Sequence, residues 1–276
     1  MKLLSLFAAV FLFSCQKKEE NKPLFAELLP LEVATPNNIP FENTSKVIHI
    51  MVALCDNKYQ GIVPVPAKIG NGQDPDNNLY WGCGYGIKSY FKKSVEWKFL
   101  KSQKKKGEIL ERIIFKHATK DAYLIADAYD GKYIKSTTQN FLSSNAGSLK
   151  DTIHISGKTI GIHGNAQLLS YIGHDGLMDF DLDENYKNVD GKSRDCVILA
   201  CISKSYFASY IKNANSRPLL WTTQFMCPEA YTVHDAISGF LLNETAEQIQ
   251  TRAAQAYSKH QKCSLKAAKK LLVTGF

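Results

Sequence analysis

The sequence predicts a single α/β domain whose mostly parallel sheet is covered by helices on both faces. Apolar runs of strand length alternate along the chain with amphipathic segments of helix length. Most of these runs are continuously apolar, as in strands buried on both faces. The chain beyond residue 45 has roughly 230 residues, which suits one domain.

The expected strands begin directly after a proline-containing segment. They are residues 46–54, 97–100, 109–115, 122–128, 168–172, 196–200 and 219–223, with one or two short strands around Gly157 within 152–162. Three lysines and Gly107 separate the second run from the third, so we expect residues 104–107 to form the exposed tip of a hairpin.

Helices are expected between these strands. They are residues 77–92, 133–142, 205–213, 228–242, 245–260 and 264–272. Asn77 or Asn78 is a suitable cap for the first, and Thr245 with Gln248 forms a capping box at the fifth. The alternation of strands and helices implies a mostly parallel sheet with helices on both faces, in a single domain over residues 46–276.

The N-terminus has the pattern of a signal peptide over residues 1–14. Lys2 precedes an apolar stretch from Leu3 to Phe13 that is too short to span a membrane. The stretch ends in LFSC, which resembles the lipobox of bacterial lipoproteins, although Phe13 is bulkier than usual there. The resemblance implies a lipid on Cys15 that anchors the chain to a membrane. The alternative is an ordinary signal peptide with an incidental Cys15.

Residues 15–45 are expected to form a flexible tether, because four prolines lie among polar residues. The QKKEE run after Cys15 is similar to tags that send some Gram-negative lipoproteins to the cell surface, or is simply a solvated part of the tether. We therefore expect the protein at the bacterial outer membrane. The chain carries a net charge of +8 without aromatic–basic interleaving, which argues against nucleic-acid binding and suits anionic lipid or polysaccharide.

Two predicted neighbouring strands end in residues capable of catalysis. The run LLSYI leads into Gly173, His174, Asp175 and Gly176, and the run CVILA leads into Cys201. Parallel neighbours would place the imidazole and the thiol at one edge of the sheet. A nearby imidazole raises the fraction of the thiol present as the nucleophilic thiolate, and it later protonates the leaving amine. The backbone N–H groups of Gly176 and Cys201 could stabilise an oxyanion.

This pair of motifs resembles the cysteine peptidases of the caspase, legumain, gingipain and separase type. Their pattern is an apolar strand ending in His-Gly and a second ending in Ala-Cys; YIGHDG and VILAC match the two halves. The resemblance implies a caspase-like fold, Cys201 as nucleophile, His174 as general base and acid, and a peptide or protein substrate without a cofactor or metal.

The sequence departs from the family pattern at two places. Asp175 separates His174 from the glycine, and Ile202 with Ser203 replaces a glycine-containing turn after the cysteine. Related peptidases use an acid near the catalytic pair to select a basic residue at the cleavage site. The resemblance therefore gives Asp175 or Asp179 a substrate-binding role.

Other readings of the same residues stay open. Cys201 could be a core thiol, as we expect for Cys55, Cys83 and Cys227, and His163 followed by Gly164 is a second choice for the base. The DFDLDE run could hold calcium but suits a solvated loop better. The alternative function is a non-catalytic binding lipoprotein that uses the Gly- and Pro-rich loop 56–76 and the region around Trp81.

Overall fold

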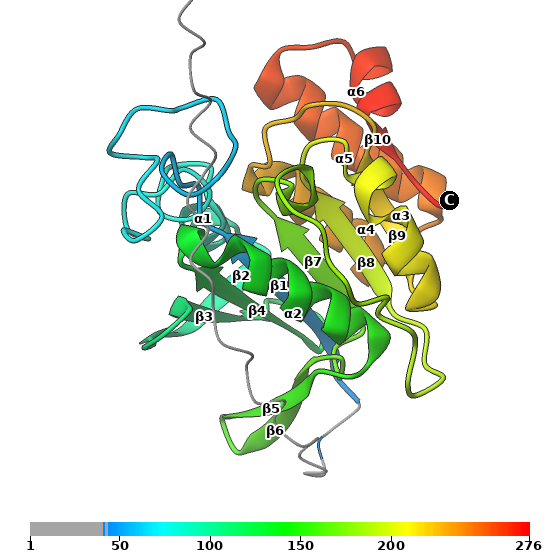
Figure 1. Ribbon diagram of the computed structural model, residues 1–276. Helices are drawn as coiled ribbons and strands as arrows, with labels where there is room; N and C mark the ends of the chain where they lie inside the picture. The colour runs from blue at the N-terminus through cyan, green and yellow to red at the C-terminus, as the bar shows by residue number, and fades with distance from the viewer. Residues whose placement is uncertain (1–40, 42–43) are drawn as a thin grey trace, which may run out of the picture.

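The computed structural model describes Phe41 and residues 44–276 (Figure 1). The predicted signal peptide, Cys15 and most of the predicted tether lie outside the described residues. Among the helices of the described part of the chain, none is long and apolar enough to cross a membrane.

The strands form an eight-stranded sheet in the order β10-β9-β8-β7-β1-β4-β3-β2, and a separate two-stranded sheet of β5 and β6. Their bounds are β1 Lys46–Ala53, β2 Trp97–Lys104, β3 Ile109–His117, β4 Ala122–Tyr129, β5 Lys150–Ile155, β6 Lys158–His163, β7 Leu168–Ile172, β8 Asp195–Leu199, β9 Arg217–Thr222 and β10 Leu272–Val273.

The central strands of the large sheet are parallel. β4, β1, β7, β8 and β9 run in one direction, whereas β2–β3, β3–β4 and β9–β10 are antiparallel pairs. This confirms the predicted α/β class with a mostly parallel sheet. The expected hairpin is also present, because β2 and β3 flank an exposed turn in which Gly107 has a φ of 93°.

Helices cover both faces of the sheet, as predicted. They are α1 Ile87–Lys93, α2 Ile134–Ala146, α3 Ser203–Asn213, α4 Ala230–Leu241, α5 Ala246–Gln261 and α6 Leu265–Leu271. α1, α4, α5 and α6 contribute to the core on one face, and α2 and α3 contribute to the core on the other. All buried apolar residues of both described cores lie between Val47 and Leu272.

The helix expected over residues 77–92 is wrong for its first ten residues, which form turns before α1 begins at Ile87. Asn78 does not cap a helix there. Its buried amide instead binds the backbone of Cys55 and Tyr80 and the carbonyl of Asn71. These long-range bonds attach the loop to the end of β1. The capping box predicted at Thr245 and Gln248 is confirmed at α5.

Candidate functional site

His174 and Cys201 emerge from the carboxyl ends of two adjacent parallel strands. Ile172 of β7 pairs with Leu199 of β8, and each candidate residue follows its strand's last paired residue by two positions. In Figure 1 these ends point toward the same end of the molecule as the long loop between β1 and α1. The tertiary fold therefore places the two residues that the sequence singled out at the same edge of the sheet.

Gly173 allows the chain to turn sharply between the end of β7 and His174. It has a φ of 145°, and a Cβ atom there would lie 2.6 Å from the carbonyl oxygen of Ala53 at the end of β1. Its N–H donates to the carbonyl of Leu199 on β8. A larger residue would separate β7 from β1, because the clash is with backbone, so the position of His174 depends on this glycine.

Asp179 holds the imidazole of His174. The distance from His174 Nε2 to Asp179 Oδ2 is 2.7 Å, and both side chains are largely buried. Asp179 Oδ2 also accepts the N–H of Gly61, which belongs to the long loop. Burial would raise the pKa of Asp179, but the bonds from His174 and Gly61 outweigh it and lower that pKa. An ionised Asp179 requires the proton on Nε2, which leaves Nδ1 as a proton acceptor.

The sulfur of Cys201 lies against the backbone of Met226. It is 3.4 Å from the Met226 nitrogen and 3.7 Å from the Met226 oxygen. Burial raises the pKa of the thiol, the Met226 N–H opposes that shift, and the charge of Asp175 adds to it. The thiol is therefore protonated at neutral pH. Among the described residues it makes no hydrogen bond to His174, whose bond through Nε2 goes to Asp179.

The turn after the thiol is strained. Ile202 has a φ of 51°, in the left-handed region that a β-branched residue rarely adopts, and α3 begins at the next residue. The sequence departs from the peptidase pattern at this turn, where glycine is common. Ile202 thus adopts a backbone conformation that glycine would favour, which costs about 1–3 kcal/mol of folding free energy.

Asp175 is fully buried beside this pair. Its Oδ1 accepts the N–H of Leu177, and its Oδ2 has no partner among the described residues. Burial, with the nearby charge of Asp179, raises the pKa of Asp175 to about 7 against the opposing Leu177 N–H. A buried carboxyl with an unused oxygen next to a thiol is a candidate for contact with a ligand.

Gly176 begins a short 3₁₀ turn, and its N–H is directed at the hydroxyl of Tyr171 in β7. A Cβ at this position would lie 2.6 Å from the ring of Phe180. The predicted oxyanion donor therefore has a packing role, and its amide is already engaged by the Tyr171 hydroxyl.

The remaining thiols are also free in the described structure. Cys55 is a core thiol as expected, and so is Cys196. The expectation was wrong for Cys227, which is exposed, and for Cys83, which is only partly buried. Cys227 directly follows Met226, the residue that contacts the Cys201 sulfur, so a second thiol lies near the candidate nucleophile.

A second cluster of His and Asp side chains lies in the middle of the sheet. His49, Asp127 and His163 offer ligand atoms that all lie within 4.8 Å of one another. However, the His163 N–H donates to His49 Nδ1, His49 Nε2 bonds Asp127, and Arg112 makes two bonds of 2.6 Å to the same carboxylate. The ligand atoms of His49 and Asp127 are therefore already satisfied, and the positive charge of Arg112 next to the carboxylate disfavours a metal cation there.

His163 is therefore not placed to act as the alternative base. It ends β6, and the β5–β6 hairpin lies at the opposite end of the molecule from the carboxyl ends of β7 and β8 (Figure 1). The other residues of the acidic run, Asp181, Asp183 and Glu184, are exposed and behave as the solvated loop that the sequence favoured.

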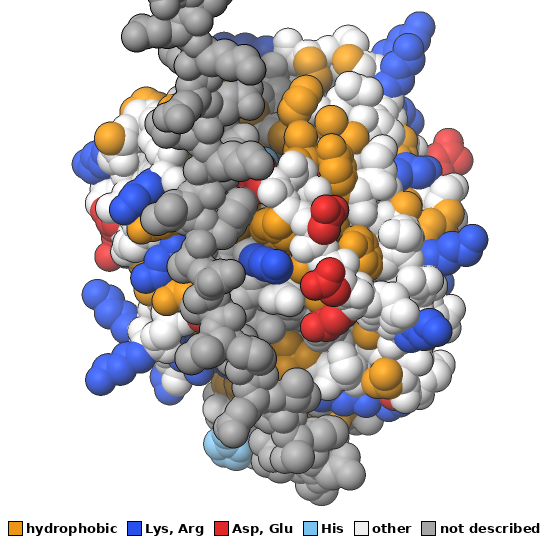
Figure 2. All heavy atoms as spheres, in the orientation of Figure 1, with side chains coloured by type: hydrophobic (Ala, Val, Ile, Leu, Met, Phe, Trp, Pro, Cys, Tyr) orange, Lys and Arg blue, Asp and Glu red, His pale blue; other side chains and the backbone are white. Residues whose placement is uncertain are grey.

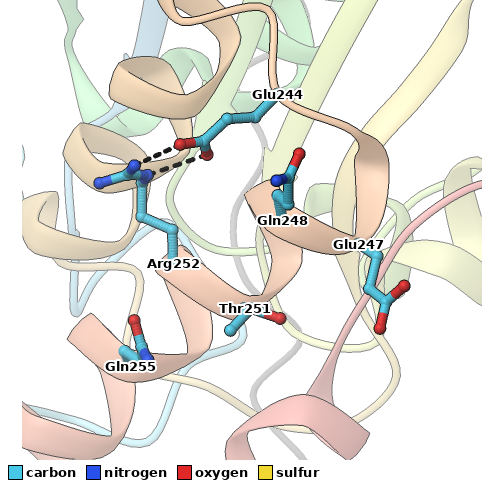
Figure 3. A pocket seen from close by; sticks show the side chains of 6 residues that line it. All are labelled: Glu244, Glu247, Gln248, Thr251, Arg252 and Gln255. Carbon is cyan, nitrogen blue, oxygen red and sulfur yellow. Dashed lines mark hydrogen bonds and ion pairs between the residues drawn. The ribbon is translucent and has the colours of Figure 1, made fainter.

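One surface pocket of about 320 Å³ lies on α5 (Figure 3). It is lined by Glu244, Glu247, Gln248, Thr251, Arg252 and Gln255. It contains no His or Cys, and its single arginine is paired with Glu244. The neighbouring Asn243 binds Lys46 at the start of β1, so this pocket lies at the edge opposite to His174 and Cys201.

Sequence reasoning missed the link between His174 and Asp179, which it had given a substrate-binding role. An acid five residues after the histidine was visible, but nothing local indicated that the intervening 3₁₀ turn would fold it back. The contact of Met226 with the thiol had no sequence signal at all.

Comparisons with protein-family models, with curated proteins and with solved structures found no match for this chain.

Proposed function

We propose that this protein is a cysteine hydrolase of caspase-like fold that acts on peptides, with Cys201 as nucleophile and His174 as general base and acid. The observation that carries the proposal is that each of the two residues lies two positions beyond one cross-strand pair, Ile172 and Leu199. Asp179 adds the third group, because it fixes the tautomer in which His174 Nδ1 can accept a proton.

The reaction begins with a protonated thiol, since burial raises the pKa of Cys201. When a peptide is bound, His174 Nδ1 takes the thiol proton as the sulfur attacks the carbonyl carbon. The carbon–nitrogen bond then breaks, and the imidazolium returns the proton to the leaving amine. Water, deprotonated by the same imidazole, hydrolyses the thioester and frees the sulfur.

Backbone N–H groups would stabilise the tetrahedral oxyanion. The Cys201 amide lies at the strained turn before α3, where the helix N-terminus favours negative charge. The Gly176 amide joins it when it turns away from the Tyr171 hydroxyl. The unpartnered oxygen of Asp175 suits a basic substrate side chain, whose charge would favour the ionised carboxylate.

The proposed cellular setting comes from the N-terminal sequence. A lipid on Cys15 would hold the domain at the bacterial outer membrane, and the peptide substrates would be those that reach that compartment. The 26 residues from Gln16 to Phe41 are long enough for the domain to reach substrates away from the membrane surface.

The second candidate function is binding without catalysis, through the loop between β1 and α1. It is favoured by the bond from Gly61 of that loop to Asp179, which closes the loop over the histidine and leaves His174 only 7% exposed. Val63, which is 87% exposed in the same loop, would then contact the partner.

Hydrolysis of a diverse peptide library, read by mass spectrometry of the new termini, separates the two. We expect cleavage by the wild type, a loss of at least about a thousandfold in Cys201→Ala and His174→Ala, and normal rates in Cys227→Ala, the matched thiol control. Cleavage that persists in Cys201→Ala would refute the proposed nucleophile. A wild type that cleaves nothing while binding peptide through the loop would favour the second function.

A further inference from the structure

The excess of positive over negative charge in this protein comes from one segment. Residues 87–120, which form α1, β2 and β3, contain eleven basic and three acidic residues, a net charge of +8. The whole chain has 34 basic and 26 acidic residues and also a net charge of +8. The rest of the chain is therefore neutral overall, and the excess charge belongs to one side of the sheet.

The charge is most concentrated on the outermost strand. All seven lysines between Lys92 and Lys106 are exposed, and among the described residues none of them forms an ion pair. The single acid in this range, Glu96, bonds to Ser238 of α4. Lys98 lies directly opposite Lys116 across β2 and β3, and Lys116 is already paired with Asp121 at 3.3 Å.

Exposed apolar side chains lie among these lysines. Val95 is 93% exposed, and Phe99 and Leu100 are each 41% exposed. Leu100 is the extra residue where the β2–β3 register shifts, and a bulge of this kind redirects a side chain out of the regular sheet. Lys92 lies 4.3 Å from the centre of the Phe99 ring, so charge and apolar surface are intermixed.

We infer that this basic edge, defined as the lysines from Lys92 to Lys106 with Val95, Phe99 and Leu100, binds the surface of an anionic lipid membrane. Lysines are attracted to acidic headgroups, and Phe and Leu enter the region between headgroups and acyl chains. A soluble polyanion would match the lysines but would leave the apolar residues without a function. Figure 2 shows basic side chains projecting from the side of the molecule on which β2 and β3 lie.

The inference concerns the folded domain alone. It does not depend on the proposed hydrolase or on a lipid at Cys15. Residues 41–276 contain both cores and lack Cys15, so this fragment tests the basic edge without an anchor. Far-UV circular dichroism and thermal unfolding should show the same folded state in the fragment and in every variant of it.

Sedimentation with lipid vesicles is the test. We expect the fragment to bind vesicles of equal parts phosphatidylcholine and phosphatidylglycerol, not phosphatidylcholine alone, and to be released by salt. Lys98, Lys101 and Lys104 replaced together by Gln should weaken binding at least about tenfold. Phe99→Ser with Leu100→Ser should also weaken it, although the charge is unchanged. The matched control replaces three exposed lysines elsewhere, Lys187, Lys192 and Lys212, by Gln and should bind normally.

Three results would overturn the inference. Equal binding to neutral vesicles would exclude an anionic surface. Binding to both vesicles and soluble heparin that is insensitive to the Phe99 and Leu100 changes would indicate a polyanion site. Lysines on an edge strand also prevent strands of separate molecules from pairing. A lysine variant that self-associates in light scattering but still binds vesicles would assign them that role alone.

Discussion

Two histidine–aspartate pairs with similar bond lengths occupy different surroundings in this protein. His174 and Asp179 lie 2.7 Å apart at the carboxyl edge of the sheet, and His49 and Asp127 lie 3.0 Å apart inside it. In the inner pair both nitrogens of His49 are used and Arg112 neutralises the carboxylate. In the edge pair one nitrogen remains for another partner. A pair with every atom satisfied stabilises the fold, whereas the proposed proton transfer needs a pair with a spare nitrogen.

The strongest test of this contrast is the same substitution in both pairs. Asp127→Asn should lower the free energy of unfolding by about 3–5 kcal/mol, because the buried guanidinium of Arg112 loses its counter-charge. Asp179→Asn should cost no more than about 1.5 kcal/mol, since it weakens hydrogen bonds at the edge. Urea unfolding of the two variants gives both values. Equal losses would mean that the edge pair is as structural as the inner one.

A second test concerns Asp175, which lies beside the edge pair. Its folded pKa of about 7 is above the unfolded value of about 3.9, so its contribution to stability is complete below about pH 4 and is lost as pH rises through 7. Asp175→Asn resembles the protonated acid. It should raise the free energy of unfolding by roughly 2–4 kcal/mol near pH 8 and leave it unchanged near pH 4. A variant that is equally or less stable than the wild type at both pH values would contradict the strain assigned to this carboxylate.

The third test uses acid against the inner pair. Burial lowers the pKa of His49 and, with the charge of His49, lowers that of His163 further. Their neutral forms therefore contribute stability that is complete above the unfolded pKa of about 6.5 and is lost as pH falls below it. Each histidine contributes a slope of at most about 1.4 kcal/mol per pH unit.

Unfolding should be followed between about pH 7 and pH 5 in the Asp175→Asn background, because Asp175 has the opposite dependence. Adding His163→Asn removes one of the two groups and keeps a residue that tolerates the left-handed backbone, where His163 has a φ of 53°. The slope should fall by up to about 1.4 kcal/mol per pH unit, the share of one histidine. An unchanged slope would show that His163 does not titrate on unfolding.

The sequence determined the local structure of this protein well. The apolar runs at 46–54, 122–128, 168–172 and 196–200 became the central parallel strands, because a run buried on both faces needs no long-range information to be recognised. The same runs placed His174 and Cys201 at strand ends, and the capping box placed the start of α5. These features depend on residues close together in the chain.

Only the tertiary structure decided what surrounds those strand ends. Met226 contacts the Cys201 thiol although it lies 25 residues further along the chain, and Gly61 binds Asp179 across 118 residues. Asn78 binds the backbone of Cys55 and does not cap the helix expected from its local sequence. Burial then set the raised pKa of Cys201 and of Asp175. Desolvation and long-range hydrogen bonds depend on which segments pack together. A pattern of neighbouring residues can therefore place His174 and Cys201 at strand ends, but cannot give the protonation state in which the fold holds the thiol.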